Sequence, residues 1–539
     1  MEMEDVGKGL DDYLSDLLAR YKSGPNNLAR TILSHSKDGR GGLIYVDETS
    51  SREYSLDELG DSSARLAAYL FEHGVERGDR VGVLLPKCPE LLITALAIWR
   101  LGAVYVPLFT AFGTDAISFR VEDSKSAFVV TNSANVAKLD DLSRSIAKVI
   151  VVGETQVDGD VSFAQALSEE PYLDFVDIDP MELIVLIYTS GTTGTPKGVP
   201  VPIWALAAFE AYMTLGIGIR SSDTYWNLAD PGWAYGLYYG VIGPLSLGHS
   251  ILFLNLPFDP KNIEGIWQRY NVTNFAGAPT AYRAMRAALS DKVIPTKLER
   301  MSSAGEPLNP EVIDWAAKSL GVEIRDHYGQ TELGMMINNH FDERLRRSVK
   351  PGSMGQNTMG FRAVVLSSDF VELGFGIDGE VAIDTYASPL FWFPGYYNAL
   401  EKTKERFSSD GRYYLSGDVA SMDDEGNFFF AGRSDDVILT AGYRVGPFEV
   451  ESTIMAHRAV AECAVIGVPD ELRGEAISAY VVLREGEVPS DQLAEEIRQV
   501  VRDRLSKTSY PRFVNFVEAL PKTPSGKIQR FLLRRDSKD

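Results

Sequence analysis

Hydrophobic and polar positions in the first half of the chain alternate between a helical period and a strand period. Leucines recur on one face of a predicted helix that Ser55 and Glu58 would cap and Gly74 would end. A second helix is predicted from about Pro89. Apolar runs rich in β-branched residues predict buried strands at RVGVLL, VYVPL, AFVVT, KVIVVG and MELIVLI. This alternation predicts an α/β fold of mainly parallel sheets covered by helices.

The pattern changes near AGRSDDVILTAGYRVGP, where charged residues and glycines interrupt the apolar runs. Beyond it, ECAVIGVP and AISAYVVL are typical of strands, and SDQLAEEIRQVVRDRL is an amphipathic helix with Ser490 as its predicted cap. About 100 residues are enough for a small domain. We therefore expect a large N-terminal domain over residues 1–433 and a small α+β domain over residues 434–539.

The composition is that of a folded protein with an acidic balance. The 539 residues include 53 Lys and Arg against 75 Asp and Glu, a net charge of −22. This charge disfavours nonspecific binding to nucleic acid or anionic membranes, because both require Lys and Arg to neutralise phosphates. The two cysteines, Cys88 and Cys463, have no metal-ligand spacing around them, and we expect them to be reduced.

Neither the N-terminus nor the most apolar stretch predicts export or a membrane span. MEMEDVGKGLDD is acidic and lacks the layout of a secretory signal. LLITALAIWRLGAVYVPL contains Arg100 and is predicted to be a buried helix that runs into a strand. We expect a cytoplasmic location.

The segment YTSGTTGTPKGVP, from Tyr188 to Pro200, follows the predicted strand MELIVLI. Its glycines let the backbone approach a ligand, its hydroxyls and N–H groups can bind phosphate oxygens, and Lys197 adds charge. The spacing differs from that of a Walker loop, because Lys197 is followed by Gly198 instead of Ser or Thr. On its own the segment is a phosphate-binding candidate, with a flexible surface connection as the alternative.

Six further motifs follow in order: SSAGEPL, DHYGQTE, YLSGDVA, AGRSDD, AGYRVGPFEVE and PKTPSGKIQR. Together with the glycine-rich loop they resemble the AMP-forming adenylating enzymes, which include acyl-CoA synthetases, peptide-synthetase adenylation domains and firefly luciferases. GAPTAYR, PDELRGE and YPR make the short- and medium-chain acyl-CoA synthetases the most similar branch. The resemblance implies two half-reactions. A carboxylate and MgATP give an acyl-adenylate and pyrophosphate, and the thiol of CoA then displaces AMP.

By this resemblance ATP would lie between the glycine-rich loop and the later motifs. Tyr328 would stack on adenine, and Asp418 would accept hydrogen bonds from both ribose hydroxyls. Gly305, Glu306 and Pro307 would line the other side of the base. The full set implied for ATP is Thr189, Ser190, Gly191, Thr192, Thr193, Gly194, Thr195, Pro196, Lys197, Gly305, Glu306, Pro307, Asp326, His327, Tyr328, Gly329, Gln330, Asp418 and Arg433.

The resemblance makes Lys527 the principal catalytic residue, because a lysine there would bridge the carboxylate and the α-phosphate and offset their repulsion. Thr331 would hydrogen-bond the α-phosphate, and Glu332 would ligate Mg²⁺. Arg444 matches a position near the nucleotide and the substrate. Asp435 matches a hinge about which the small domain would rotate, bringing Lys527 in for adenylation and away for thioester formation.

The resemblance also implies sites for CoA and for the acid. The positions implied for CoA are Ala441, Gly442, Tyr443, Arg473, Tyr510, Pro511 and Arg512. Those implied for the acyl pocket are Trp233, Tyr235, Gly236 and Gly329. Similar acetyl-CoA synthetases carry Trp in place of Gly329, where it limits the pocket to acetate. A glycine there favours a longer acid, from propionate or butyrate to medium chain, branched or aromatic.

Two other functions share some of these features. A stand-alone adenylating enzyme that loads an acyl, aryl or amino acid onto a carrier protein would have the same nucleotide motifs. Asp230 lacks the FDxS context of amino-acid-activating relatives, which disfavours an amino acid. A catalytically silent nucleotide sensor is disfavoured because Lys527, Glu332 and Asp418 are all present. The exact acid and the oligomeric state stay open, a homodimer included.

Overall fold

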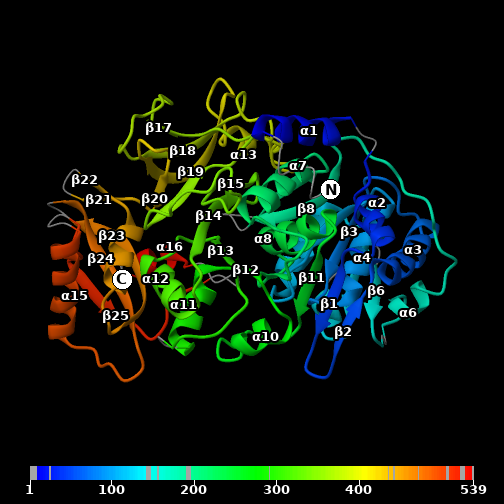
Figure 1. The fold of residues 1–539 in the computed structure, drawn as a ribbon, viewed down its shortest axis with the longest axis horizontal. Helices are drawn as coiled ribbons and strands as arrows, with labels where there is room; N and C mark the ends of the chain where they lie inside the picture. The colour runs from blue at the N-terminus through cyan, green and yellow to red at the C-terminus, as the bar shows by residue number, and fades with distance from the viewer. Residues whose placement is uncertain are drawn as a thin grey trace.

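The structure is a computed structural model that describes residues 9–23, 26–140, 147–154, 157–189, 196–289, 292–434, 436–440, 443–470, 473–505, 509–522 and 528–536. These residues form three β-sheets with helices packed on them (Figure 1). In Figure 1 the seven-stranded sheet lies towards the right, the five-stranded sheet lies at the left, and the thirteen-stranded sheet runs through the middle.

The seven-stranded sheet has the order β7-β6-β5-β3-β4-β8-β9 and is parallel except for β9, which pairs antiparallel with β8. Successive side chains point to opposite faces, and both faces are apolar. Val130 packs in the cluster that contains α3 and α4, whereas Val129 packs in the cluster that contains α5. The strands are β3 Arg80–Leu84, β4 Val104–Pro107, β5 Phe128–Asn132, β6 Lys148–Val152, β7 Val161–Ser162, β8 Leu183–Thr189 and β9 Lys197–Pro202. The helices are α3 Leu56–Glu72, α4 Pro89–Arg100, α5 Thr114–Ser124 and α6 Phe163–Ala166.

The thirteen-stranded sheet has the order β17-β18-β19-β20-β16-β15-β14-β13-β12-β10-β11-β1-β2. From β1 to β14 along this order the strands are parallel, and beyond β14 they are antiparallel. The turn from β14 to β15 spans only residues 331–333, which is too short for a parallel crossover. The strands are β1 Gly42–Val46, β2 Ser51–Tyr54, β10 Tyr225–Asn227, β11 Ser250–Leu254, β12 Asn274–Gly277, β13 Arg300–Ala304, β14 Ile324–Gln330, β15 Gly334–Asn338, β16 Ser353–Asn357, β17 Ala363–Leu366, β18 Gly379–Asp384, β19 Tyr413–Met422 and β20 Phe428–Arg433.

Helices cover both faces of the parallel part of this sheet. One face packs against α10, α11 and α12, and the other packs against α7 and the segment from α8 to α9. Two π-helical turns, η4 Tyr212–Gly216 and η5 Tyr238–Ile242, continue α7 and α8, and such turns often mark functional sites. The helices are α1 Leu10–Lys22, α2 Leu28–Leu33, α7 Ala205–Ala211, α8 Ala234–Leu237, α9 Gly243–Ser246, α10 Ile263–Arg269, α11 Pro279–Leu289, α12 Pro310–Ser319 and α13 Leu400–Lys404, with 3₁₀ turns η2 Ser34–Asp38 and η3 Val136–Leu139.

The five-stranded sheet contains the C-terminal strands in the order β22-β21-β24-β23, with β25 also paired to β24. Ile497 and Val501 of α15 are buried against it, and Ser490 accepts the cap hydrogen bond from Leu493 N. The elements are β21 Ile438–Thr440, β22 Tyr443–Val445, α14 Pro447–Met455, β23 Val460–Asp470, β24 Gly474–Leu483, α15 Asp491–Arg504, β25 Phe513–Phe516 and α16 Arg530–Asp536. β20 ends in the large sheet at Arg433, and the domain boundary expected there stays a prediction.

The structure confirms the predicted cap of α3 and the predicted passage from a buried helix into a strand. α3 begins with the expected capping box of Ser55 and Glu58, and α4 runs into β4. Cys88 and Cys463 are buried free thiols.

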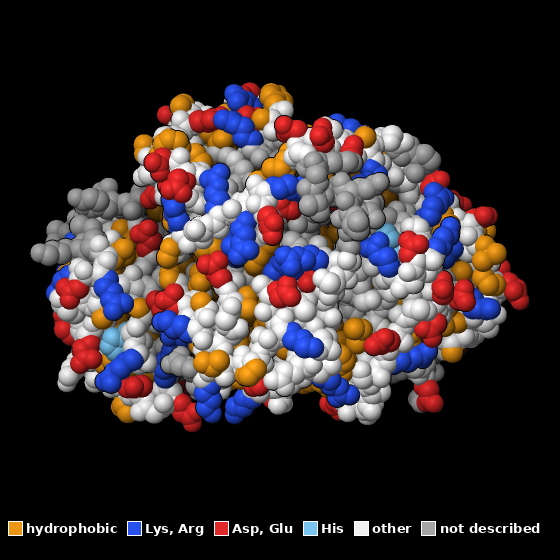
Figure 2. Space-filling model, viewed as in Figure 1, with side chains coloured by type: hydrophobic (Ala, Val, Ile, Leu, Met, Phe, Trp, Pro, Cys, Tyr) orange, Lys and Arg blue, Asp and Glu red, His pale blue; other side chains and the backbone are white. Residues whose placement is uncertain are grey.

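Within the described residues, no helix is long and apolar enough to cross a membrane. Figure 2 shows acidic and basic side chains interspersed over the visible face, without one basic patch.

Candidate active site

The end of β14 and the facing strands β19 and β20 bring most of the described nucleotide residues together. Ligands of parallel sheets usually bind beyond the carboxyl ends of the strands. Successive side chains of β14 point to opposite faces. Tyr328 therefore points towards Asp418 on β19, whereas His327 points towards Tyr212 on the other side of the sheet.

Asp418 is the centre of the predicted nucleotide end. Its carboxylate is buried, and Oδ2 accepts hydrogen bonds from Tyr328 Oη at 2.6 Å and from Gln330 Nε2 at 2.8 Å. Arg433, its register partner on β20, lies 3.2 Å from Oδ1. These donors orient the carboxylate, which a bound ribose would share with them.

Glu332 is the centre of the predicted phosphate end. It is buried, and Oε1 accepts a hydrogen bond from Tyr396 Oη at 2.7 Å. Arg406 Nε donates to the same Tyr396 oxygen at 3.1 Å, and Lys197 Nζ lies 4.9 Å from the centroid of the Tyr396 ring. Burial and the nearby Arg406 lower the pKa of Lys197. Two cations, one of them Lys197, and one carboxylate suit a triphosphate and its metal ion.

Tyr396 and Arg406 are residues of this end that the sequence did not identify. Tyr396 lies in the aromatic run FWFPGYYN, between β18 and β19, and Arg406 follows α13. The concentration of aromatic residues around a Pro-Gly turn was a signal of a structured loop. Nothing in the local pattern connects that loop with Glu332, because the contact depends on the strand order of the large sheet.

The predicted adenine side of the site contains a carboxyl group with a raised pKa, that of Asp326. Asp326 Oδ2 accepts a hydrogen bond from Leu308 N at 3.3 Å, and burial raises the pKa of Asp326 to about 8. Its Oδ1 is buried without a hydrogen-bond partner among the described residues. Glu306, two residues before Leu308, forms an ion pair with Arg283 at 3.0 Å. A neutral carboxyl group with a free oxygen suits the amino group of adenine, which is a hydrogen-bond donor.

His327 lies on the opposite face of β14 from the other predicted nucleotide residues. Its Nδ1 is 2.8 Å from Tyr212 Oη, and its Nε2 is 3.1 Å from the carbonyl oxygen of Asn339. Tyr212 Oη lies in turn 3.4 Å from Tyr235 Oη. The predicted contact of His327 with ATP therefore does not fit its position, because its side chain is on the side of the predicted acyl residues.

The predicted acyl residues follow β10. The Trp233 ring lies 5.3 Å from the Phe109 ring and 5.5 Å from the Phe112 ring, and all three are partly exposed. A Cβ on Gly236 would overlap the carbonyl oxygen of Asp230, and one on Gly329 would overlap Gly334 of β15. The expectation that these glycines leave open space is therefore corrected, since they allow close backbone packing instead.

Asp230, the acidic residue beside this segment, already has a hydrogen-bond partner within the protein. Its Oδ1 accepts a hydrogen bond from Gly232 N at 2.7 Å. Burial raises the pKa of Asp230, and the positive charge of Lys87 opposes that rise. Lys87 is half-buried and donates to the carbonyl oxygen of Leu228 at 2.8 Å. Because the positive charge of Lys87 offsets the negative charge of Asp230, Asp230 is not available to pair with a substrate ammonium group.

The residues predicted for CoA belong to the small sheet. Tyr443 lies on β22 opposite Thr440. Arg473 precedes β24, and the Arg512 guanidinium lies 4.6 Å from the centroid of the Tyr510 ring before β25. The predicted positions that lie outside the described residues are Ser190, Gly191, Thr192, Thr193, Gly194, Thr195, Asp435, Ala441, Gly442 and Lys527.

Glu332 fits a magnesium ion that is bound mainly by phosphates. Within the described ranges there is no group of three or more His, Cys, Asp or Glu residues that could hold a metal ion. Mg²⁺ usually takes one or two carboxylates and leaves its other positions to phosphate oxygens and water. A single buried carboxylate oriented by Tyr396 is consistent with that mode.

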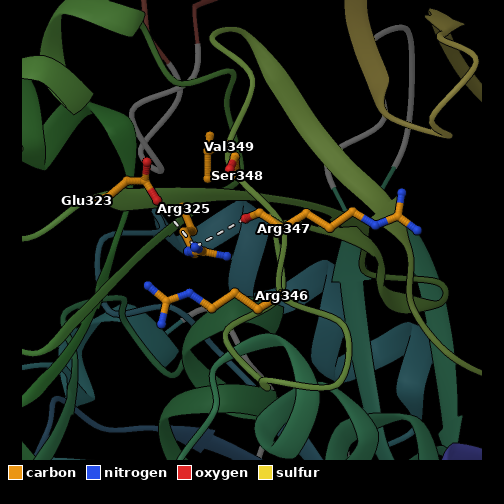
Figure 3. A pocket seen from close by; sticks show the side chains of 6 residues that line it. All are labelled: Glu323, Arg325, Arg346, Arg347, Ser348 and Val349. Atoms are coloured by element: carbon orange, nitrogen blue, oxygen red, sulfur yellow. Dashed lines mark hydrogen bonds and ion pairs between the residues drawn. The ribbon is translucent and has the colours of Figure 1, made fainter.

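A polar surface pocket of about 420 Å³ lies at the start of β14, away from these residues (Figure 3). Arg325 is at its centre and contacts Glu323 at 3.3 Å and the carbonyl oxygen of Arg347 at 3.4 Å (Figure 3). Arg346, Ser348 and Val349 complete its lining. The pocket contains no residue that the motifs predict, so it is separate from the candidate active site.

Comparisons with known proteins agree with these features. A family model described as "AMP-binding enzyme" matches residues 36–397, and one described as "AMP-binding enzyme C-terminal domain" matches residues 449–527. Acetyl-coenzyme A synthetase of Bacillus subtilis (strain 168) is 37% identical, over 91% of this chain and 86% of that protein. 4-Hydroxybutyrate–CoA ligase 1 of Metallosphaera sedula is 35% identical, over 92% of this chain and 86% of that protein. The crystal structure of Brucella canis acyl-CoA synthetase is 43% identical and covers 98% of both chains, with a TM-score of 0.77.

The first family model spans more than half of the chain and includes Glu332, and the relatives cover most of it. All three relatives are named as synthetases or ligases that form CoA thioesters. The chain therefore belongs to the AMP-binding enzyme family and is an AMP-forming acid–thiol ligase.

Proposed function

We propose that this enzyme activates a short- to medium-chain carboxylic acid longer than acetate as an acyl-adenylate, and then transfers the acyl group to CoA. The observation that carries the proposal is the hydrogen bond from Tyr238 Oη to the carbonyl oxygen of Thr331, at 3.2 Å. It holds the segment with Trp233 and Tyr235 against the turn that contains Glu332. An acid bound beside the aromatic rings would meet the α-phosphate there.

The adenylation step needs donors and cations around two anions. We propose that Tyr328, Asp418 and Arg433 hold the adenosine part of ATP. Thr331 donates a hydrogen bond to the α-phosphate, and Lys527 neutralises charge between the carboxylate and that phosphate. When bound, Mg²⁺ at Glu332 supplies positive charge to the phosphates.

We propose that the two half-reactions use one site in two domain arrangements. The domains are residues 1–433 and 434–539, with the hinge at Asp435. Rotation of the small domain moves Lys527 away from the reacting groups. It brings in the CoA-binding residues Tyr443, Arg473, Tyr510, Pro511 and Arg512, together with Ala441, Gly442 and Arg444. A change of sheet between β20 and β21 supports a division near this point.

The preference for an acid longer than acetate rests only on the missing side chain at position 329, since a Trp there limits the pocket to acetate in similar acetyl-CoA synthetases. Gly329 itself packs against the backbone of β15, so this position does not supply the space for a longer chain. The names of the relatives include both acetyl-CoA synthetase and 4-hydroxybutyrate–CoA ligase, so the acid must be measured.

A panel of straight-chain acids from acetate to decanoate tests the proposal. AMP release is measured with ATP and Mg²⁺, with and without CoA. We expect CoA-dependent AMP release that is greater with butyrate to octanoate than with acetate. Preference for acetate would contradict the chain-length proposal. Acid-dependent exchange of pyrophosphate into ATP without any CoA thioester product would instead indicate transfer to a carrier protein.

A further inference from the structure

Two buried side chains, His327 and Tyr212, and the partly exposed Tyr235 form a hydrogen-bond chain beside the proposed acyl site. It begins at the carbonyl oxygen of Asn339, which lies 3.1 Å from Nε2 of His327. Nδ1 of His327 lies 2.8 Å from Tyr212 Oη, and Tyr212 Oη lies 3.4 Å from Tyr235 Oη. Tyr235 is in α8, next to Trp233, so the chain ends at the residues proposed to contact the acid.

The direction of each hydrogen bond follows from the first acceptor. A carbonyl oxygen only accepts, so the proton of His327 is on Nε2. Burial lowers the pKa of His327 to about 3, and the ring is therefore neutral, with Nδ1 as an acceptor. Tyr212 must donate its proton to Nδ1, which leaves its oxygen able only to accept. Tyr235 Oη is then the last donor of the chain. Its acceptor, Tyr212 Oη, lies 3.4 Å away, which is longer than the usual O–H···O distance.

The end of this chain carries unused hydrogen-bonding capacity. Tyr235 is partly exposed, and the hydroxyls of Tyr212 and Ser302 lower its pKa against the rise caused by burial. Ser302 Oγ lies close to the Tyr235 hydroxyl and is buried without a hydrogen bond of ordinary geometry to a described residue, and Nε1 of Trp233 is buried without one as well. Buried polar atoms usually have partners, because an unpaired one destabilises the folded protein. A bound acid that supplies an oxygen would satisfy them.

The surroundings select an uncharged group. His327 is neutral, and the charges of Lys87 and Asp230 offset each other near Trp233. A second carboxylate would find no unpaired cation here among the described residues. An ammonium group would find no ionised partner, because Asp326, the carboxyl group that acts on Tyr235, has a pKa raised to about 8 by burial and is mainly uncharged. A hydroxyl or keto oxygen can accept from Tyr235 and bond to Ser302 without a net charge.

We propose that this enzyme selects carboxylic acids whose chain or ring carries an uncharged oxygen substituent, a hydroxyl or a keto group, which binds to Tyr235 and Ser302. The inference rests on the proposed function, since it describes the acid that the same site activates. Sites built to hydrogen-bond a substrate hydroxyl discriminate strongly against the analogue without it, because their own polar groups are left unpaired.

Matched acids test this inference on the full-length enzyme. The pairs are butyrate with 4-hydroxybutyrate, hexanoate with 6-hydroxyhexanoate, 4-oxopentanoate with pentanoate, and benzoate with 4-hydroxybenzoate. The measured quantity is kcat/KM for the acid, from CoA-dependent AMP release. We expect the oxygen-bearing acid to be favoured by about tenfold or more in at least one pair. Equal or lower kcat/KM for the oxygen-bearing acid in every pair would overturn the inference.

Variants locate the effect at Tyr235. Tyr235→Phe should reduce the preference to about twofold or less, mainly by lowering kcat/KM for the oxygen-bearing acid. Tyr225→Phe is the matched control, because Tyr225 Oη donates to the carbonyl oxygen of Tyr239 in the same layer, and this variant should keep the preference. Ser302→Ala gives a second measurement if Tyr235→Phe is unstable. A preference that survives both Tyr235→Phe and Ser302→Ala would contradict the assignment.

The same assays separate the two proposals. If unsubstituted acids are converted to CoA thioesters as efficiently as their partners, the proposed function stands and the selection by an oxygen substituent is wrong. If no acid supports exchange of pyrophosphate into ATP, the proposed function itself fails and the inference fails with it.

Discussion

Burial changes the chemistry of single side chains in the candidate site. Asp326 and His327 are neighbours on β14, and both are enclosed. Burial raises the pKa of Asp326 to about 8 and lowers that of His327 to about 3, because it disfavours the charged form of each group. At neutral pH both side chains are mainly uncharged, which suits hydrogen bonding to neutral parts of the substrates.

The raised pKa of Asp326 predicts how the free energy of unfolding depends on pH. Its pKa in the folded protein is above the ordinary value of 3.8, so the folded state binds the extra proton between pH 3.8 and about 8. Stability must therefore fall as the pH rises through this window, by up to about 1.4 kcal/mol per pH unit. Buried His327 and His340 act the other way, but only below pH 6.5. The test is to measure the free energy of unfolding between pH 6.5 and 8.

Asp326→Asn is the matched variant for this measurement, because it keeps the shape and removes the titration. The fall in stability between pH 6.5 and 8 should be smaller in the variant by the amount due to Asp326. Equal slopes in the two proteins would mean that the carboxyl group is already ionised in the native state.

Tyr396 is the residue that should tune magnesium binding at Glu332. Its hydroxyl is 2.7 Å from Glu332 Oε1, and partners of metal-binding carboxylates typically change metal affinity about 10–100-fold when removed. We expect Tyr396→Phe to raise the Mg²⁺ concentration needed for half-maximal pyrophosphate exchange by about tenfold or more. Tyr386→Phe is the control, since that side chain is 78% exposed. An unchanged Mg²⁺ requirement in Tyr396→Phe would exclude this role.

Among the elements, α16 depends on buried ion pairs. Arg530 lies 2.8 Å from Glu451 of α14, and Arg534 lies 2.6 Å from Asp436. The Glu451 and Asp436 side chains are only 8% and 13% exposed, so these pairs are largely out of solvent. The proposed catalytic residue Lys527 comes three positions before Arg530 in the sequence.

Arg530→Met should destabilise the small sheet and its helices. Removing one partner leaves Glu451 buried without its ion pair, which typically costs about 3–5 kcal/mol. Arg498→Met removes an ion pair with Glu495, which is 57% exposed, and should cost less than about 1 kcal/mol. Denaturant unfolding of both variants gives the comparison. Similar losses for the two would show that the Arg530 pairs contribute no more than surface contacts.

At the scale of the whole molecule, α14 of the small unit lies against β20 of the large sheet, and the described residues make few polar contacts there. Asn309, before α12, donates to Ser452 Oγ of α14 at 3.5 Å. Gly446 lies so close to Ala431 that a Cβ would overlap its carbonyl oxygen. A long hydrogen bond and a contact between two small residues are compatible with the rotation that we propose.

Lys527→Ala tests the proposed rotation. If Lys527 acts only in adenylation, the variant should lose about 10²–10³-fold in pyrophosphate exchange. Formation of the CoA thioester from supplied acyl-adenylate should stay within about threefold of the wild-type rate, as expected when different residues serve the second half-reaction. Equal loss of both half-reactions would contradict the two-arrangement proposal.

Local features of the sequence were sufficient for most elements and for the family. The capping box of Ser55 and Glu58, the strand MELIVLI and the Ser490 cap all act within a few residues, so their pattern is visible in the sequence. The ordered motifs likewise indicated an adenylating enzyme, which the family models confirm. The roles of individual site residues stay predictions.

The contacts between distant segments depended on the assembled sheets. The pairing of Tyr396 with Glu332, the direction of His327 towards Tyr212 and the close packing at Gly329 arise where segments far apart in the chain meet. Periodicity gives the face of a residue within its own strand, but the neighbour on that face depends on strand order and helix packing. The sequence alone therefore identified the chemistry, and long-range packing determined which side chains surround it.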